Sequence, residues 1–277
     1  MVGIETQQST YVTEINRWRQ TKEDNLRAED GWLTLIGLFW LHEGVNTVGA
    51  NPASDVPIAA ENVTDQLGTI EFRDGQATLQ VTANVPVTVD GLQTTQAVLR
   101  DDSGEGGPSL VKIGSVTFFV IRRGDEYGIR VRDADNPARL TFTGRKWFPV
   151  DLQYQVSGRF IPHDVARSIP IANSSGQTEL MDNPGRVEFV LDGQPLALEA
   201  FTAGKDELWF VFKDATSNKS TYGAGRFLYV PLSADGMVRL DFNKAYHPPC
   251  AFTPYATCPR PPKENSLLVE ILAGERH

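Results

Sequence analysis

The sequence predicts a mainly β protein of two packed antiparallel domains, with one helix before them. The chain has 277 residues, enough for about two domains of ordinary size. Its 24 glycines and 17 prolines exceed the usual share and indicate many turns between short elements. Asp-Gly pairs recur between short β-rich runs, and such pairs are typical of β-hairpins.

Residues 1–31 are expected to form an N-terminal helical segment. Within residues 9–29, apolar side chains recur near the period of 3.6 that is typical of an amphipathic helix, namely Tyr11, Ile15, Trp18 and Leu26. Ser9 or Thr10 would cap its start, and Gly31 stands just past its end. The aromatic face would pack on the fold or, alternatively, meet a partner chain.

Residues 32–144 are expected to form a β-sandwich, since short strands are separated by turns about every ten residues. The expected strands are Leu33–Leu41, Thr69–Phe72, Ala77–Val81, Val85–Val89, Ser109–Ile113, Val116–Ile121 and Gly128–Val131. Explicit hairpin turns lie at Asp74-Gly75, at Asp90-Gly91 and around Gly124.

Residues 145–277 are expected to form a second β domain. Residues 1–144 carry 12 basic and 20 acidic side chains, against 14 and 15 in the rest, so the charge changes where the pattern changes. The expected strands are Leu152–Ile161, Arg186–Leu191, Leu196–Phe201, Leu208–Phe212, Arg226–Val230, Val238–Leu240 and Leu267–Leu272. His163 and Asp164 would lie in a turn after the first of these strands.

Several classes of function are excluded or disfavoured. The formal charge of −9 disfavours nucleic-acid binding, which needs a basic face. No apolar run reaches the length of a membrane span, and the start of the chain lacks a signal-peptide core. We therefore expect a cytoplasmic protein without membrane contact. Common nucleotide, zinc-protease and serine-hydrolase motifs are absent from the sequence.

The first half resembles a forkhead-associated domain. The resemblance rests on Gly44–Gly49, Ser54–Ile58, Val87–Gly91 and Lys112–Phe119, which follow the order of that family's motifs. The family places an arginine where this chain has Ala50, and an asparagine where it has Asp90. Because an arginine fork binds phosphate and a carboxylate repels it, the fold that the resemblance implies would not bind phosphothreonine.

Nearly the whole chain resembles the bacterial and archaeal family called domain of unknown function 1684. The resemblance rests on the strings at Trp32–Leu41, Arg145–Val150, Thr221–Phe227, Leu240–Tyr246 and Pro248–Phe252, and on the short pieces Cys258-Pro259, Pro261-Pro262, Glu264-Asn265 and Ala273–Glu275. His247 departs from the family's pattern, which more often has asparagine there. The resemblance implies no activity, so any site must be inferred from the residues themselves.

Residues 221–265 hold the highest density of reactive side chains. Their six prolines, at 248, 249, 254, 259, 261 and 262, exclude a central strand or a helix, so we expect a rigid loop that covers the second domain. We predict ligand binding by Tyr222, Arg226, Asp241, Asn243, Tyr246 and His247. Arg226 follows two glycines and would present its fork to an anion, or alternatively form a structural ion pair with Asp241 or Glu275.

The other reactive side chains of this segment each have a structural role as an alternative. Asp241 and His247 could form an acid–base pair, or Asp241 and Asn243 could cap a turn. Cys250 and Cys258 should lie close together, as buried thiols, a disulfide or a redox pair. Their spacing does not fit a zinc site, so we expect no metal and no cofactor.

Three classes of function remain, of which one is a structural role for the two paired β domains in an assembly, and the other two are as follows. The first is a binding protein or enzyme for a small anionic or carboxylated ligand, with its pocket in the second domain. The second is a protein-interaction module on a forkhead-associated-like sandwich that has lost phosphothreonine binding. The sequence assigns no catalytic residue and does not decide whether the chain is an enzyme, nor its oligomeric state.

Overall fold

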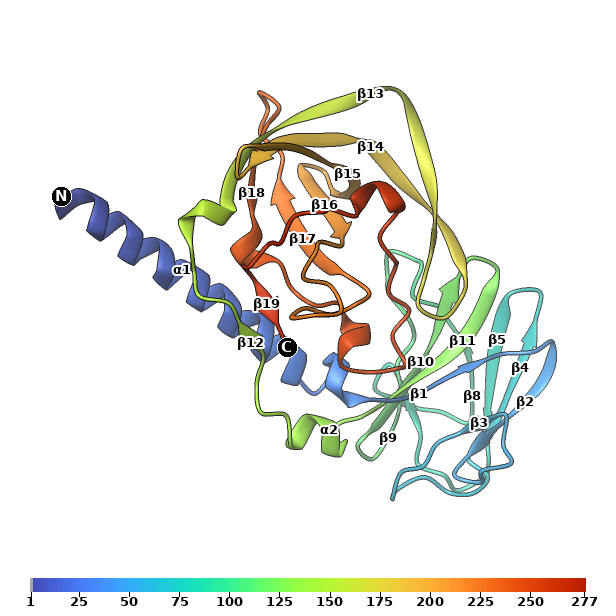
Figure 1. Cartoon of the computed structure of the whole chain (residues 1–277). Helices are drawn as coiled ribbons and strands as arrows, with labels where there is room; N and C mark the ends of the chain where they lie inside the picture. The colour runs from blue at the N-terminus through green and yellow to red at the C-terminus, as the bar shows by residue number, and fades with distance from the viewer. Residues whose placement is uncertain (1) are drawn as a thin grey trace. The chain divides into compact units, whose positions relative to one another are not determined.

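The computed structural model describes residues 2–277, apart from the side chains of residues 2–7 and 166. It is mainly β, with one long helix at the start (Figure 1), as predicted. The chain divides into two compact units. We call residues 26–142 the N-terminal unit, and residues 1–25 together with 143–277 the C-terminal unit. Over residues 2–277, no helix is both long and apolar enough to cross a membrane.

Helix α1 (Val2–Arg27) begins earlier than expected, so Ser9 and Thr10 lie inside it and do not cap it. No proline stands between Val2 and Ser9, so no residue there prevents the helix from beginning before Ser9. The Ser9 carbonyl instead accepts a hydrogen bond from the Thr13 hydroxyl at 2.9 Å. Residues up to Asn25 belong to the C-terminal unit, where Ile15 is fully buried. The helix is thus part of the second domain's packing.

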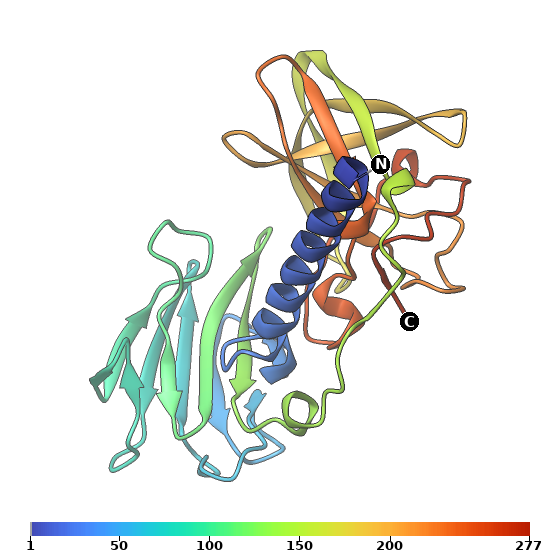
Figure 2. The same ribbon diagram turned by 90° about the vertical axis from the view of Figure 1, so that its left-hand side faces the viewer.

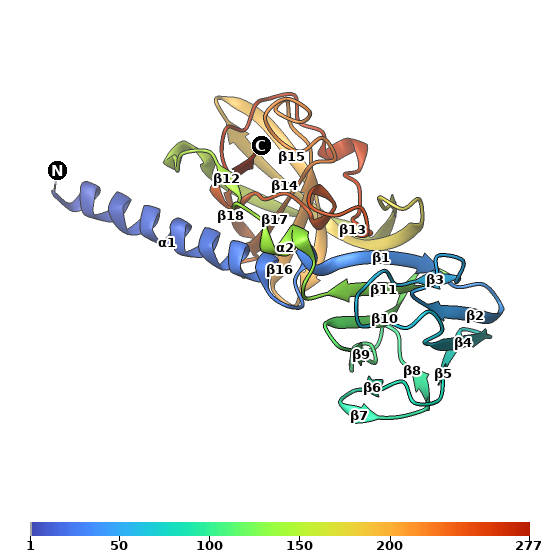
Figure 3. The same ribbon diagram turned by 90° about the horizontal axis from the view of Figure 1, so that it is seen from below.

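The N-terminal unit is a sandwich of two sheets (Figure 3). One sheet has the order β1-β11-β10-β9-β6-β7, and the other has the order β3-β2-β4-β5-β8. The elements are η1 (Trp32–Thr34), β1 (Leu35–Trp40), β2 (Gly44–Gly49), β3 (Val56–Pro57), β4 (Gly68–Arg73), β5 (Gln76–Val81), β6 (Thr88–Val89), β7 (Leu92–Gln93), β8 (Gln96–Leu99), β9 (Val111–Ile113), β10 (Val116–Arg123), β11 (Glu126–Asp133) and α2 (Pro137–Leu140). Both sheets contribute apolar side chains to one core, including Ile70, Leu79, Phe118 and Ile129.

The Asp-Gly turns form the hairpins that the sequence predicts. At Asp74-Gly75 the φ angles are 49° and 76°, and at Asp192-Gly193 they are 50° and 75°. Two consecutive positive φ values are the geometry of the tight turn that matches the strand twist. The first turn joins β4 to β5, which pair from Gly68 to Arg73.

The C-terminal unit is built on one sheet with the order β17-β16-β15-β14-β13-β18. An isolated bridge joins Leu232, the residue after β17, to Val238 in β18. Figure 2 shows α1 beside this unit. The elements are β12 (Lys146–Trp147), η2 (Leu152–Tyr154), β13 (Gln155–Ala172), β14 (Thr178–Leu191), β15 (Gln194–Gly204), β16 (Glu207–Phe212), β17 (Arg226–Pro231), β18 (Met237–Asp241), η3 (Phe242–Lys244), η4 (Pro249–Ala251), η5 (Lys263–Asn265) and β19 (Glu275–Arg276). Its core includes Phe189, Leu198, Phe210 and Leu240.

Two local expectations for this unit are wrong. His163 and Asp164 lie in no turn, because β13 continues to Ala172 through an irregularity in its pairing with β14. The His163 ring instead contacts Glu199 at 3.0 Å. Leu267–Leu272 forms no strand, because its backbone bonds to a loop: Leu267 N–H donates to the Lys213 carbonyl, and Ile271 N–H donates to the Asp214 carboxylate. Tertiary partners thus override its apolar pattern.

We predict that Gly225→Ala destabilises the protein more than Gly236→Ala. Both glycines have positive φ, 101° and 75°, a conformation that costs other residues about 1–2 kcal/mol. At Gly225 an added Cβ would lie 2.5 Å from the Phe212 carbonyl oxygen, whereas at Gly236 the nearest atom is 3.9 Å away. The clash should add about 1–3 kcal/mol. Urea unfolding of both variants measures the difference. An equal loss of unfolding free energy in the two variants would contradict the close contact between Gly225 and the Phe212 carbonyl.

Candidate functional site

Arg226 does not face a cleft, contrary to expectation. It starts β17, and its side chain is 1% exposed. Its guanidinium donates to the Asp214 carboxylate at 2.7 Å, to the Ile271 carbonyl at 3.0 Å, and to the Ala273 carbonyl. The ion-pair partner is therefore neither Asp241 nor Glu275 but Asp214, which the sequence analysis did not single out. Because the guanidinium is also almost fully buried, Arg226 is not exposed to a ligand.

A second buried ion pair lies around Glu275. Its carboxylate accepts a hydrogen bond from Arg145 at 2.5 Å and from the His247 backbone N–H at 2.8 Å. Burial raises the pKa of Glu275 to about 7, against the opposing effect of the Arg145 charge. The pair fastens β19, at the end of the chain, to the start of β12.

His247 is a buried neutral ring. Its Nε2 accepts a hydrogen bond from the Tyr222 backbone N–H at 3.1 Å, which requires a free lone pair on that nitrogen. Its Nδ1 lies 3.6 Å from the Glu275 carboxylate. Burial lowers the pKa of His247 to about 3. The ring is therefore not paired with Asp241, as the acid–base hypothesis required.

Asp241 and Asn243 form a separate cluster with the helix. The Tyr11 hydroxyl donates to the Asp241 carboxylate at 2.8 Å and accepts from the Asn243 amide at 2.9 Å. Asp241 also accepts from the Asn243 backbone N–H at 3.2 Å and so caps η3. Asn243 further bridges to the backbone of Asp151 in both directions. This cluster follows the capping alternative and ties α1 to the sheet.

Tyr222 and the two cysteines form another cluster. The Tyr222 hydroxyl donates to the Cys250 carbonyl at 3.0 Å. The Cys250 backbone N–H donates to Cys258 Sγ at 3.2 Å, and both residues are thiols. The expectation that the two cysteines lie close together is confirmed. The hydrogen bond with the Cys258 side chain holds the pKa of Cys250 below its ordinary value.

Tyr246, one of the predicted site residues, lines a pocket of about 550 Å³. We call this the aromatic–lysine pocket; its lining residues are Trp18, Lys22, Glu207, Tyr229, Pro231, Lys244 and Tyr246. Three aromatic rings form its walls: Tyr229 and Tyr246 are stacked with centroids 6.5 Å apart, and Trp18 meets Tyr246 edge-on at 6.0 Å. The pocket belongs entirely to the C-terminal unit.

Lysine charge dominates the aromatic–lysine pocket. The Lys22 ammonium lies 4.1 Å from the Tyr246 ring centroid and 5.5 Å from that of Trp18. Burial lowers the pKa of Lys22, and the Arg145 charge lowers it further. No carboxylate among the described residues lies within salt-bridge distance of Lys22. Lys244 is 4.0 Å from the Asp241 carboxylate. Lys22 and Lys244 are the cationic lining residues and Glu207 is the anionic one; the Glu207 charge opposes the lowering of the Lys22 pKa.

The tyrosine hydroxyls of the pocket are available to a ligand. Neither the Tyr229 nor the Tyr246 hydroxyl hydrogen-bonds to a residue that the structure describes. Burial raises the pKa of Tyr229 to about 12 and that of Tyr246 further, so both remain proton donors at neutral pH. The sequence signal for this site is the spacing of Trp18 and Lys22, which places both on one helix face.

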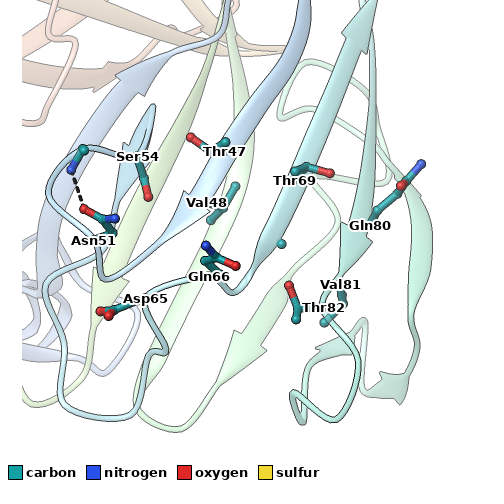
Figure 4. Close-up of a pocket in the computed structure, with 12 residues that line it drawn as sticks. Thr47, Val48, Asn51, Ser54, Asp65, Gln66, Thr69, Gln80, Val81 and Thr82 are labelled. Carbon is teal, nitrogen blue, oxygen red and sulfur yellow. Dashed lines mark hydrogen bonds between the residues drawn. The ribbon is translucent and has the colours of Figure 1, made fainter.

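A different pocket of about 530 Å³ lies in the N-terminal unit, across β2, β4 and β5 (Figure 4). Threonines, amides and backbone line it, and Asp65 is its charged lining residue. It offers no cation to a phosphate. Asp90, where the forkhead-associated pattern has asparagine, binds Arg100 at 3.0 Å and the Leu110 N–H at 2.9 Å.

Metal ligands do not gather in the described part of the chain. No group of three or more histidine, cysteine, aspartate or glutamate side chains there is placed to hold a metal ion. The reactive groups of the C-terminal unit instead form two buried ion pairs, a polar cluster, a thiol pair and the aromatic–lysine pocket.

Comparisons with known proteins give a family but no activity. Residues 140–276 match the family described as "Protein of unknown function (DUF1684)". The matched range contains most of the motifs quoted above, but not Trp32–Leu41. An uncharacterized protein of Haloarcula marismortui, solved by solution NMR, is 31% identical; the similarity covers 50% of this chain and 79% of that one, with a TM-score of 0.43.

Forkhead-associated domains are among the solved structures similar to part of this chain. One, from a study of phosphothreonine-dependent interactions, is 17% identical over 34% of this chain and 92% of its own, with a TM-score of 0.25. The FhaA domain is 17% identical over 34% and 97%, with the same TM-score. No curated protein matches the chain.

We predict that Arg226→Met lowers the free energy of unfolding by about 3–5 kcal/mol, because it leaves the Asp214 carboxylate buried without its counter-charge. Arg186→Met is the matched control, since the Arg186–Glu188 pair is 43% and 49% exposed and should contribute at most about 1 kcal/mol. Chemical denaturation measures both. Similar losses in the two variants would contradict a structural role for Arg226.

Acid should destabilise the protein through His247. Its pKa is about 3 in the folded chain and about 6.5 when unfolded, so between these values only the unfolded chain binds the proton. The contribution of His247 to stability therefore falls as pH drops below about 6.5, by up to about 1.4 kcal/mol per pH unit. Glu275, whose pKa burial raises to about 7, contributes in the opposite sense below pH 7. The stability of His247→Gln relative to wild type should therefore rise as pH falls below about 6.5, whereas that of His42→Gln, at an exposed ring, should not. Parallel pH profiles of unfolding in wild type and His247→Gln would refute the assignment.

Proposed function

From the membership of this chain in the DUF1684 family of unknown function, which assigns no chemistry, and from the geometry of its C-terminal unit, we propose that the protein binds a small anion that carries a flat ring. The aromatic–lysine pocket would hold it. The observation that carries this proposal is the Lys22 ammonium, which lies over two aromatic rings and has no carboxylate within salt-bridge distance among the described residues.

The charge of the pocket selects an anion. Removing an ammonium from water is unfavourable unless a counter-charge replaces the lost hydration. Lys22 is partly buried and has aromatic faces as neighbours, which compensate only part of that cost. A carboxylate or phosphate between Lys22 and Lys244 would supply the rest through charge-assisted hydrogen bonds.

The walls of the pocket select a flat ring. Tyr229 and Tyr246 lie nearly parallel, with an interplanar angle of 19°, and Tyr229 also stacks on Trp209 at 5.6 Å. Such a row of rings offers planar apolar surface to an aromatic group or a sugar face. The tyrosine hydroxyls would add hydrogen bonds at the rim. Among the residues predicted from sequence, Tyr246 keeps a binding role here.

Calorimetric titration with phenyl phosphate tests the proposal, with benzyl alcohol and inorganic phosphate as probes that lack the charge or the ring. We expect phenyl phosphate to bind more tightly than either. Lys22→Met should weaken its binding about ten- to a hundred-fold, the equivalent of one charge-assisted hydrogen bond.

Lys219→Met is the matched control, because Lys219 is 68% exposed and pairs with Glu270 at 3.4 Å; it should bind like wild type. The proposal fails if no probe gives a saturable signal, if benzyl alcohol binds as well as phenyl phosphate, or if Lys22→Met and Lys219→Met bind it equally. Circular dichroism of each variant confirms that it is folded.

A further inference from the structure

Cys250 and Cys258 are held next to each other by separate anchors. Cys258 is fixed by Ser174: its N–H donates to the Ser174 hydroxyl at 3.0 Å, and its carbonyl accepts from the Ser174 N–H at 2.8 Å. Cys250 lies in η4, where Thr253 N–H donates to the Pro249 carbonyl at 3.2 Å. The Tyr222 hydroxyl holds the Cys250 carbonyl at 3.0 Å. These hydrogen bonds therefore hold the two cysteines near each other.

Prolines make this arrangement rigid. Pro248 and Pro249 precede Cys250, Pro254 lies between the cysteines, and Pro259 follows Cys258. Each fixes its own φ angle, and the bridge between Asn173 and Pro259 adds a further constraint. A bond between the sulfurs would thus close a short loop whose ends already meet.

The two cysteines differ in access and in electrostatic setting. Cys258 is 6% exposed, whereas Cys250 is only partly buried. The hydrogen bond with the Cys258 side chain is the main cause that lowers the pKa of Cys250, and the charge of the exposed Arg260 lowers it further. Reaction with a dissolved oxidant needs an accessible thiolate. Cys250 has both properties, and Cys258 is placed to react with it next.

We propose that Cys250 and Cys258 form a reversible dithiol–disulfide site that hydroperoxides oxidise. The Cys250 thiolate attacks one peroxide oxygen, the O–O bond breaks, and Cys250 becomes a sulfenic acid while water, or an alcohol from an organic peroxide, leaves. The Cys258 thiolate then attacks the sulfenic sulfur, the S–O bond breaks, and a second water leaves. The two sulfurs lose two electrons and the peroxide gains them; the thiol protons end in the released molecules. A reducing dithiol reverses the change by exchange.

Hydrogen peroxide treatment of the full-length protein, followed by intact-mass and peptide mass spectrometry, tests this site. We expect the wild type to lose two hydrogens and to yield one peptide that links Cys250 to Cys258. Dithiothreitol should restore both thiols. This measurement uses the wild-type chain, so it does not depend on how a variant folds.

Variants then assign the roles. In Cys258→Ser, the sulfenic acid at Cys250 should persist and be trapped by dimedone. In Cys250→Ser, Cys258 should remain largely reduced. Arg260→Gln should slow oxidation several-fold, whereas Arg239→Gln, also at an exposed arginine, should not.

Three results would overturn the proposal: both thiols staying reduced, linkage only between different chains, or direct progress to sulfinic acid without the internal link. None of these outcomes bears on phenyl phosphate binding, since neither cysteine lines the aromatic–lysine pocket. The two proposals can therefore fail separately.

Discussion

Asp214 joins three segments of the C-terminal unit through one buried carboxylate. It accepts hydrogen bonds from Arg226 in β17, from the Ile271 N–H in the final segment, and from Thr216 in its own loop. A buried carboxylate is tolerated only when its charge and lone pairs are met. Because Arg226 also binds the Ile271 and Ala273 carbonyls, this single pair fixes the course of the chain's last residues.

The position of those last residues decides what lies beside them. Once residues 271–273 are fixed, Glu275 reaches Arg145 and the His247 N–H. His247 in turn receives the Tyr222 N–H, and Tyr222 holds the Cys250 carbonyl. The thiol pair therefore sits at the end of a chain of hydrogen bonds that begins at Asp214. Polar residues that looked reactive in the sequence serve mainly to build this network.

The aromatic–lysine pocket is not part of this buried hydrogen-bond network. Its lysines are only partly buried, and the hydroxyls of its two tyrosines have no hydrogen-bond partner among the described residues. Helix α1 contributes two of its lining residues, Trp18 and Lys22, and both contact Tyr246. The helix is itself fastened by Tyr11 to Asp241 and Asn243. A polar cluster that caps η3 thus also positions the residues that we propose to bind the anion.

Local sequence alone determined the strand-rich fold, the Asp-Gly hairpins and the helix, because turn chemistry and side-chain period act over a few residues. It also indicated the proximity of Cys250 and Cys258 and the loop-like character of the proline-rich segment. It did not determine which carboxylate would meet Arg226, since Asp214, Asp241 and Glu275 are all plausible partners along the chain. Nor did it show that Leu267–Leu272 would bond to a loop, or that Lys22 and Tyr246, 224 positions apart, would share a pocket. Only tertiary packing decides such contacts, because the cost of burying a charge depends on every neighbour that the fold brings to it.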